Sequence, residues 1–197
     1  MTPELDRTEN NQVAGGYGIP IIHCSEREFF DAFRADLAGS TEHVTILSPF
    51  LSQNRAIRYY PVLRSLMVRQ VKVEVYARPR HEQPETLRAL CGEVERGLKR
   101  AGVRFHVRPG MHEKVGMIDG RILWHGSLNI FSHNDTRESM LRFESPELVQ
   151  EVWADLGLGP FSYPSDRGEP TYSIEVEKAP SCPKCGRGGC LMMSKKG

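Results

Sequence analysis

Residues 112–129 constrain the fold of this chain most strongly, because they combine apolar runs with a turn signal. Apolar side chains precede Asp119 and Gly120, and a second apolar run begins at Ile122. An Asp-Gly pair between two such runs is favoured in the tight turns that join antiparallel strands. The stretch therefore predicts a β-hairpin.

Four polar side chains lie near the ends of this predicted hairpin: His112, Lys114, Ser127 and Asn129. Side chains two positions apart in a strand share a face, and so do partners on adjacent strands. A two-residue turn at Asp-Gly pairs His112 with Ser127, and a turn shifted by one residue pairs Lys114 with Ser127. Either register gathers an imidazole, a cation, a hydroxyl and an amide on one surface, which suits a phosphate group.

These residues form a motif that resembles the signature of the phospholipase D superfamily, His-x-Lys, four residues, Asp, six residues, Gly-Ser-x-Asn. The positions that match it without a gap are His112, Lys114, Asp119, Gly126, Ser127 and Asn129. A match at this many fixed positions is specific, whereas a lone His-x-Lys would carry no weight. The family usually has an acidic residue about one strand further on, for which Glu138 is the best candidate and Glu144 a rival.

The resemblance implies a phosphodiesterase that needs no catalytic metal or cofactor. His112 would attack phosphorus, expel an alkoxide and form a phosphohistidine that water hydrolyses. Neutral imidazole is a suitable nucleophile near pH 7. Lys114 and Asn129 would hold the non-bridging oxygens, Ser127 would add a hydrogen bond, and Glu138 would orient an imidazole.

Two features of the motif need separate interpretation. Asp119 lies seven positions from His112 and faces away from it on an unbroken strand, so we expect a mainly structural role at the turn. The family uses a second histidine from a second copy of the motif to protonate the leaving group, yet of the 7 histidines here only His112 begins His-x-Lys. We therefore expect a two-fold homodimer with His112 of each chain facing one cleft.

The order of apolar patterns predicts an α/β domain over residues 19–157, with a mixed, mostly parallel sheet flanked by helices on both faces. The expected helices cover residues 25–39, 54–69, 84–100 and 145–156, with a break or kink at Pro61. The expected strands, besides the hairpin, cover residues 19–24, 43–51, 71–77, 103–107 and 140–143.

The second expected helix carries arginines with two tyrosines among them. Arginine interleaved with aromatic residues is one way to grip a nucleic-acid backbone, whereas a solvated helix face is the more common meaning of such a pattern. The residues concerned are Arg55, Arg58, Arg64, Arg69, Tyr59 and Tyr60.

The two ends of the chain differ from this domain in composition. Residues 1–18 are polar and predict a flexible arm, and residues 158–181 predict a linker. In the tail, residues 182–197, Cys182 and Cys185 resemble the first knuckle of a zinc ribbon, but only Cys190 follows. Because structural zinc takes four ligands, either the tail is incomplete, another residue or chain supplies a ligand, or no zinc binds.

Composition limits the setting in which the protein works. With 197 residues, 39% of them hydrophobic and 26% charged, the chain has room for one core. No apolar run reaches the length of a membrane span and no signal peptide is evident, so we expect a cytoplasmic protein without a membrane partner. Its 5 cysteines then favour thiols or metal ligands over disulfides.

The predicted function is that of an endonuclease, with DNA a more favoured partner than RNA, because a zinc-ribbon-like tail accompanies arginine-rich segments. The net charge of +1 does not itself mark a nucleic-acid binder, so any basic surface must be local. Two alternatives stay open. One is a lipid phosphodiesterase or phosphatidyltransferase, and the other is a non-catalytic nucleic-acid-binding module of a larger DNA-processing assembly.

Overall fold

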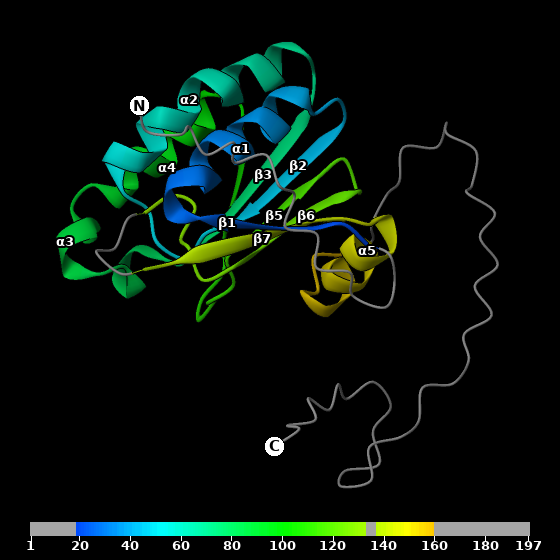
Figure 1. Ribbon diagram of the computed structural model, residues 1–197. Coiled ribbons are helices and arrows are strands. Elements are labelled where there is room, and N and C mark those ends of the chain that lie inside the picture. The colour runs from blue at the N-terminus through cyan, green and yellow to red at the C-terminus, as the bar shows by residue number, and fades with distance from the viewer. Residues whose placement is uncertain (1–18, 133–136, 160–197) are drawn as a thin grey trace, which may run out of the picture. The chain divides into compact units, whose positions relative to one another are not determined.

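The computed structural model describes residues 19–132 and 137–159, which form a seven-stranded sheet with helices on both faces (Figure 1). The strands are β1 (Ile21–Ser25), β2 (His43–Leu47), β3 (Lys72–Ala77), β4 (Arg104–Val107), β5 (Val115–Ile118), β6 (Ile122–Gly126) and β7 (Ser139–Glu144). The helices are α1 (Glu26–Gly39), α2 (Gln53–Val68), the 3₁₀ turn η1 (Arg80–Glu82), α3 (Glu85–Arg88), α4 (Cys91–Arg100) and α5 (Pro146–Asp155). The predicted arm, most of the predicted linker and the cysteine-containing tail lie outside the described residues.

The strand order is β1-β7-β6-β5-β2-β3-β4. The mixed α/β sheet predicted from the sequence is confirmed, but its mostly parallel character is wrong. Only β2–β3 and β3–β4 pair in parallel, and the other four neighbouring pairs are antiparallel. The reason is that only helical crossovers produce parallel neighbours, whereas the β5–β6 hairpin and the strands that extend it add antiparallel ones.

Two apolar layers hold the sheet to its helices. Helices α1, α2 and α4 cover one face, and α5 covers the other (Figure 1). On the first face the rings of Phe29 and Phe33 meet Trp124 edge-on, with centroid distances of 5.2 and 5.9 Å. On the second face Trp153 of α5 belongs to a buried apolar cluster that also contains Val115 and Leu47, and its ring meets that of His43 at a centroid distance of 5.6 Å. Burial of each such side chain contributes about 1.5–3 kcal/mol.

Two helices differ from the sequence prediction. Helix α2 runs through Pro61 without ending there, and Pro61 lies on the exposed side of the helix. The helix predicted over residues 84–100 is divided into α3 and α4, with a turn at residues 89–90 between them. Among the helices of the described residues, none is long and apolar enough to cross a bilayer.

One edge of the sheet collects the ends of several strands. Because β5 runs antiparallel to β2, its first residue Val115 pairs with Leu47, the last residue of β2. In the same way Gly126, at the end of β6, pairs with Met140 near the start of β7. The segments that precede β5, follow β6 and precede β7 therefore meet at this edge, beside the loop that follows β2.

Candidate active site

A pocket of about 530 Å³ opens at this edge of the sheet. Its lining residues are Phe50, His112, Glu113, Lys114, His125, Gly126, Ser127, Asn129 and Glu138. It thus brings together five of the six side chains that the sequence analysis assigned to catalysis, and only Asp119 does not line it. We call it the active-site pocket.

The hairpin that carries these residues has neither of the two registers predicted from the sequence. Ile118 pairs with Ile122, so the loop between the strands has three residues rather than two. Asp119 and Gly120 have φ values of 51° and 63°, as an Asp-Gly turn favours, but Arg121 also belongs to the loop. The polar side chains nevertheless meet, because they lie beyond the ends of β5 and β6, where strand alternation no longer decides which way a side chain points.

Lys114 and His112 are in direct contact. The Nζ atom of Lys114 lies 3.2 Å from both ring nitrogens of His112 and donates to the His112 carbonyl oxygen at 2.6 Å. An ammonium group only donates, so the ring nitrogen it contacts must offer a lone pair, and a neutral imidazole has one such nitrogen. Lys114 is 6% exposed, whereas His112 is exposed. The cation is therefore fixed in the wall behind an accessible nucleophile.

Burial lowers the pKa of Lys114 below the usual lysine range. The negative charge of Glu138 opposes this shift, while the positive charge of Arg78 adds to it. Glu138 is half-buried on the same pocket wall. The charge of its carboxylate thus supports the charged form of the lysine, an effect separate from the orienting role toward an imidazole predicted from the sequence.

Asn129 and Ser127 both line the pocket but differ in the hydrogen bonds that their side chains form. Asn129 is 2% exposed, and its side-chain oxygen has no hydrogen-bond partner among the described residues. The Ser127 hydroxyl accepts from the backbone N–H of Ser139 at 3.2 Å. Ser127 is thereby fixed to β7, whereas the carboxamide oxygen of Asn129 is a buried acceptor that only a hydrogen-bond donor can satisfy.

Asp119 serves the loop between α1 and β2. Its carboxylate accepts hydrogen bonds from the backbone N–H groups of Thr41, Glu42 and His43 at 2.9–3.0 Å and from the Ser40 hydroxyl at 2.8 Å. Burial alone would raise the pKa of this carboxylate, but these hydrogen bonds outweigh burial and lower it. The contacts agree with the structural role that the sequence predicted for Asp119.

Gln83, which sequence reasoning missed, and Arg78, in a basic loop that the sequence predicted to border the ligand crevice, hold the loops of the pocket. The fully buried side chain of Gln83 donates to the carbonyls of Pro49 and Arg78, at 2.9 and 3.0 Å, and accepts from the N–H of Leu51 at 3.1 Å, which fixes both sides of Phe50. The Arg78 guanidinium donates to the carbonyl of Met111, next to His112. Nothing in the local sequence pattern marks Gln83.

The exposed imidazole of His125, on β6, also lines the pocket. It lies two residues before Ser127 of the motif, and a strand pattern alone gave no reason to select it. The structure thus places two histidines of one chain at the same pocket. No group of three or more potential metal-ligating side chains occurs among residues 19–132 and 137–159.

The fold and pocket together define a phospholipase D-like domain, and sequence comparison agrees. The family model described as "Cardiolipin synthase, PLD-like domain" matches residues 33–157, which is more than half of the chain. The chain therefore belongs to this phospholipase D-like family. A comparison with curated protein sequences found no significant match.

Solved structures with the same fold have low sequence identity to this chain. Nuc, a phospholipase D family member from Salmonella typhimurium, has a TM-score of 0.55 and 14% identity, over 74% of this chain and 97% of Nuc. NucT from Helicobacter pylori has a TM-score of 0.57 and 16% identity, over 71% of this chain and 94% of NucT. TrmBL2, an archaeal chromatin protein described with a novel mode of DNA binding, has a TM-score of 0.51 and 7% identity, over 74% of this chain and 54% of TrmBL2.

Proposed function

We propose that this protein is a metal-independent endonuclease that cleaves phosphodiester bonds through a phosphohistidine intermediate. The observation that carries the proposal is the contact between an exposed imidazole, His112, and a buried ammonium, Lys114, in a pocket that Asn129 also lines. A nucleophile beside a fixed cation and an amide matches the needs of phosphoryl transfer, in which charge on the non-bridging oxygens must be stabilised.

The reaction proceeds in two displacements. His112 forms a P–N bond as the P–O bond to the leaving group breaks, and a second imidazole gives that oxygen its proton. Water then attacks the phosphohistidine, the P–N bond breaks, and a phosphate monoester leaves. When a phosphate enters, the Nζ of Lys114 exchanges its contact with the imidazole for one with a phosphate oxygen, which frees the ring lone pair for attack.

The second imidazole comes from a homodimer in this proposal. His112 of the partner subunit faces the same cleft and protonates the leaving oxygen, so that two half-sites form one complete site. The position of His125 supports a different source within one chain, because its exposed ring lines the same pocket. The two sources predict that activity depends differently on the mixing of subunits.

Nucleic acid is the proposed substrate, with DNA favoured. The arginine-rich helix α2, the zinc-ribbon-like tail and the DNA binding described for TrmBL2 support it. The description of the matching family model names cardiolipin synthase, which supports the alternative of a lipid phosphodiesterase or phosphatidyltransferase. A nucleic-acid-binding module without turnover is the other alternative.

A substrate panel in EDTA tests the proposal. The unsubstituted chain should cleave DNA, or RNA, and leave phospholipid vesicles intact, and His112→Ala should abolish cleavage without changing the melting temperature. The Glu151→Gln variant, altered at an exposed carboxylate on α5, serves as the matched control and should keep full activity. Cleavage of lipid alone, or retention of nucleic acid without cleavage, would replace the proposal by one of the alternatives.

The tail carries a separate proposal, that Cys182, Cys185 and Cys190 hold a structural zinc ion with a fourth ligand from elsewhere. Metal analysis of the purified full chain should then find zinc at one equivalent or less per chain. Cys182→Ser should remove it, whereas Cys91→Ser, at a buried free thiol, should not. A chain purified without zinc that binds none on addition would contradict this proposal.

A further inference from the structure

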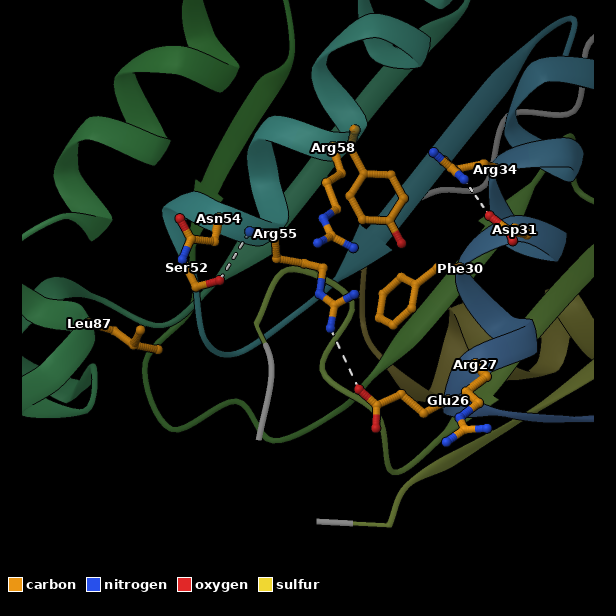
Figure 2. Close-up of a pocket in the computed structure, with 11 residues that line it drawn as sticks. Glu26, Arg27, Phe30, Asp31, Arg34, Ser52, Asn54, Arg55, Arg58 and Leu87 are labelled. Carbon is orange, nitrogen blue, oxygen red and sulfur yellow. Dashed lines mark hydrogen bonds and ion pairs between the residues drawn. The ribbon is translucent and has the colours of Figure 1, made fainter. Parts of the chain in front are cut away.

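A second and larger pocket, of about 870 Å³, lies between the N-terminal parts of α1 and α2 (Figure 2). Arginines from both helices line it, and we call it the arginine pocket. Its charged residues are Arg27, Arg34, Arg55, Arg58, Glu26 and Asp31. Four guanidinium groups against two carboxylates leave a formal surplus of two positive charges, although the whole chain has a net charge of only +1.

The surplus charge is carried by Arg27 and Arg58. Both side chains are exposed, and neither has an ion-pair partner among the described residues. Arg34 differs, because it pairs with Asp31 (Figure 2). Two unpaired guanidinium groups at the rim of one concave surface are suited to bind phosphate oxygens, which a guanidinium group contacts with two parallel N–H donors.

Arg55 lies deeper in the pocket and is only weakly compensated. It is 8% exposed, its guanidinium stacks 3.6 Å from the ring centroid of Phe30, and its ion pair with Glu26 is 3.6 Å long. Burial lowers the pKa of Arg55, and the positive charge of Arg58 adds to this shift, while Glu26 opposes it. Beside it, the Tyr59 hydroxyl is buried without a hydrogen-bond partner among the described residues. An anion in the pocket would stabilise both groups.

The arginine pocket and the active-site pocket are neighbours along the chain. Phe50 lines the active-site pocket and Ser52 lines the arginine pocket, so their Cα atoms are at most about 7 Å apart. The backbone N–H of Ser52 also donates to the carbonyl of Phe131 at 2.7 Å, which ties this rim to the segment that follows Asn129. The rims of the two pockets are therefore adjacent, as a polymer with regularly spaced phosphates would require in order to occupy both.

We propose that the arginine pocket seats backbone phosphates of the same nucleic-acid strand whose scissile phosphate enters the active-site pocket. This inference rests on the proposed function and adds a residue-level basis for choosing a polymeric phosphodiester over a lipid. The interpretation of the α2 arginines as a solvated face thus applies to Arg64, whereas Arg55 and Arg58 line a site. Arg69, at the end of the helix, donates to the carbonyl of Ser40 at 2.7 Å. The tyrosines do not act as exposed stacking platforms, because Tyr59 is buried and Tyr60 is half-buried.

Binding of a fluorescently labelled single-stranded oligonucleotide tests the inference, measured by anisotropy across a salt series. The full-length chain carries His112→Ala throughout, so that the probe is not cleaved. Adding Arg27→Ala and Arg58→Ala should weaken binding by about 25-fold at 0.1 M salt. It should also reduce the slope of log K against log salt concentration by about 1.4, because a chain with two fewer phosphate contacts releases fewer counterions on binding. Adding Arg64→Ala and Arg96→Ala instead removes the same charge from exposed helix positions outside the pocket and should have a much smaller effect.

The outcomes separate this inference from the proposed function. Equal effects of the two double substitutions, or no oligonucleotide binding by the His112→Ala chain, would overturn the inference. A different experiment tests the proposed function, which fails if the unsubstituted chain does not cleave nucleic acid in EDTA. A chain that binds through Arg27 and Arg58 but never cleaves would keep the inference and make the protein a binding module.

Discussion

At the scale of single residues, Lys114 is held between opposing influences on its charge. Burial lowers its pKa and the carboxylate of Glu138 raises it, so the cation that the proposed mechanism requires depends on its acidic neighbour. A buried ammonium without such a neighbour would release its proton more easily. The acidic residue downstream of the motif is therefore expected to control the alkaline limit of activity.

Glu138→Gln should move the alkaline limb of the pH profile of kcat/KM to lower pH. The protonated form of Lys114 is the active one, and loss of the Glu138 charge lets its pKa fall further. Glu113→Gln is the graded control, because Glu113 supports Lys114 less strongly, and its limb should move less in the same direction. An unchanged limb, or one displaced to higher pH in Glu138→Gln, would show that the lysine does not set it.

Asp119→Asn should lower the free energy of unfolding by about 1.5–3 kcal/mol near neutral pH, because the carboxylate accepts several hydrogen bonds as an anion. The folded-state pKa is depressed, so this stabilisation is present above the unfolded-state pKa and is lost as pH falls through the folded-state pKa. Urea melts at neutral and acid pH measure it, with Asp31→Asn as an exposed control expected to change stability by less than about 1 kcal/mol. A loss that persisted undiminished in acid would contradict the assignment.

At the scale of secondary-structure elements, the motif glycine Gly126 sets how closely β6 approaches β7. A Cβ atom there would lie 2.3 Å from the carbonyl oxygen of Ser139 and 2.9 Å from the Cα of Met140. Both are backbone atoms, which move only if the strand moves. The glycine therefore allows Ser127 to reach its backbone partner on β7 and places the segment that carries Asn129.

Gly126→Ala should destabilise the fold by about 1–3 kcal/mol, since overpacking must displace a strand. Gly39→Ala is the matched control, because a Cβ there meets nothing within 4 Å and alanine suits the end of a helix better than glycine. Thermal melts of the two variants should differ in the sign of the effect. A melting temperature of Gly126→Ala equal to that of the unsubstituted chain would show that the strands have room for the methyl group.

The elements also show what sequence reasoning reaches. Apolar periodicity and caps predicted the order of strands and helices, because those signals are local, and the motif predicted the cluster around His112. The hairpin register was missed because a two-residue loop and a three-residue loop can both begin with Asp-Gly, and the local sequence does not distinguish them. The antiparallel majority, the pocket role of His125 and the support from Gln83 depend on contacts between distant segments, which no local pattern records.

At the scale of the whole molecule, the source of the leaving-group proton decides how many chains form a site. If His112 of the partner subunit supplies it, unsubstituted chains mixed with His112→Ala chains and allowed to exchange should show activity proportional to the square of the unsubstituted fraction. If His125 of the same chain supplies it, activity should fall linearly, and His125→Ala alone should abolish turnover. The activity of equal mixtures distinguishes the quadratic from the linear dependence, and a dilution series establishes that the subunits exchange.

The central claim is a covalent bond between phosphorus and His112, and trapping that bond tests it most directly. The unsubstituted chain is mixed with oligonucleotide in EDTA, quenched in alkali, which preserves phosphohistidine, and mapped by peptide mass. The account predicts a nucleotide or oligonucleotide adduct on the peptide that contains His112, absent in the His112→Ala chain. Cleavage in EDTA with no adduct at any time point, or with an adduct on another residue, would contradict it.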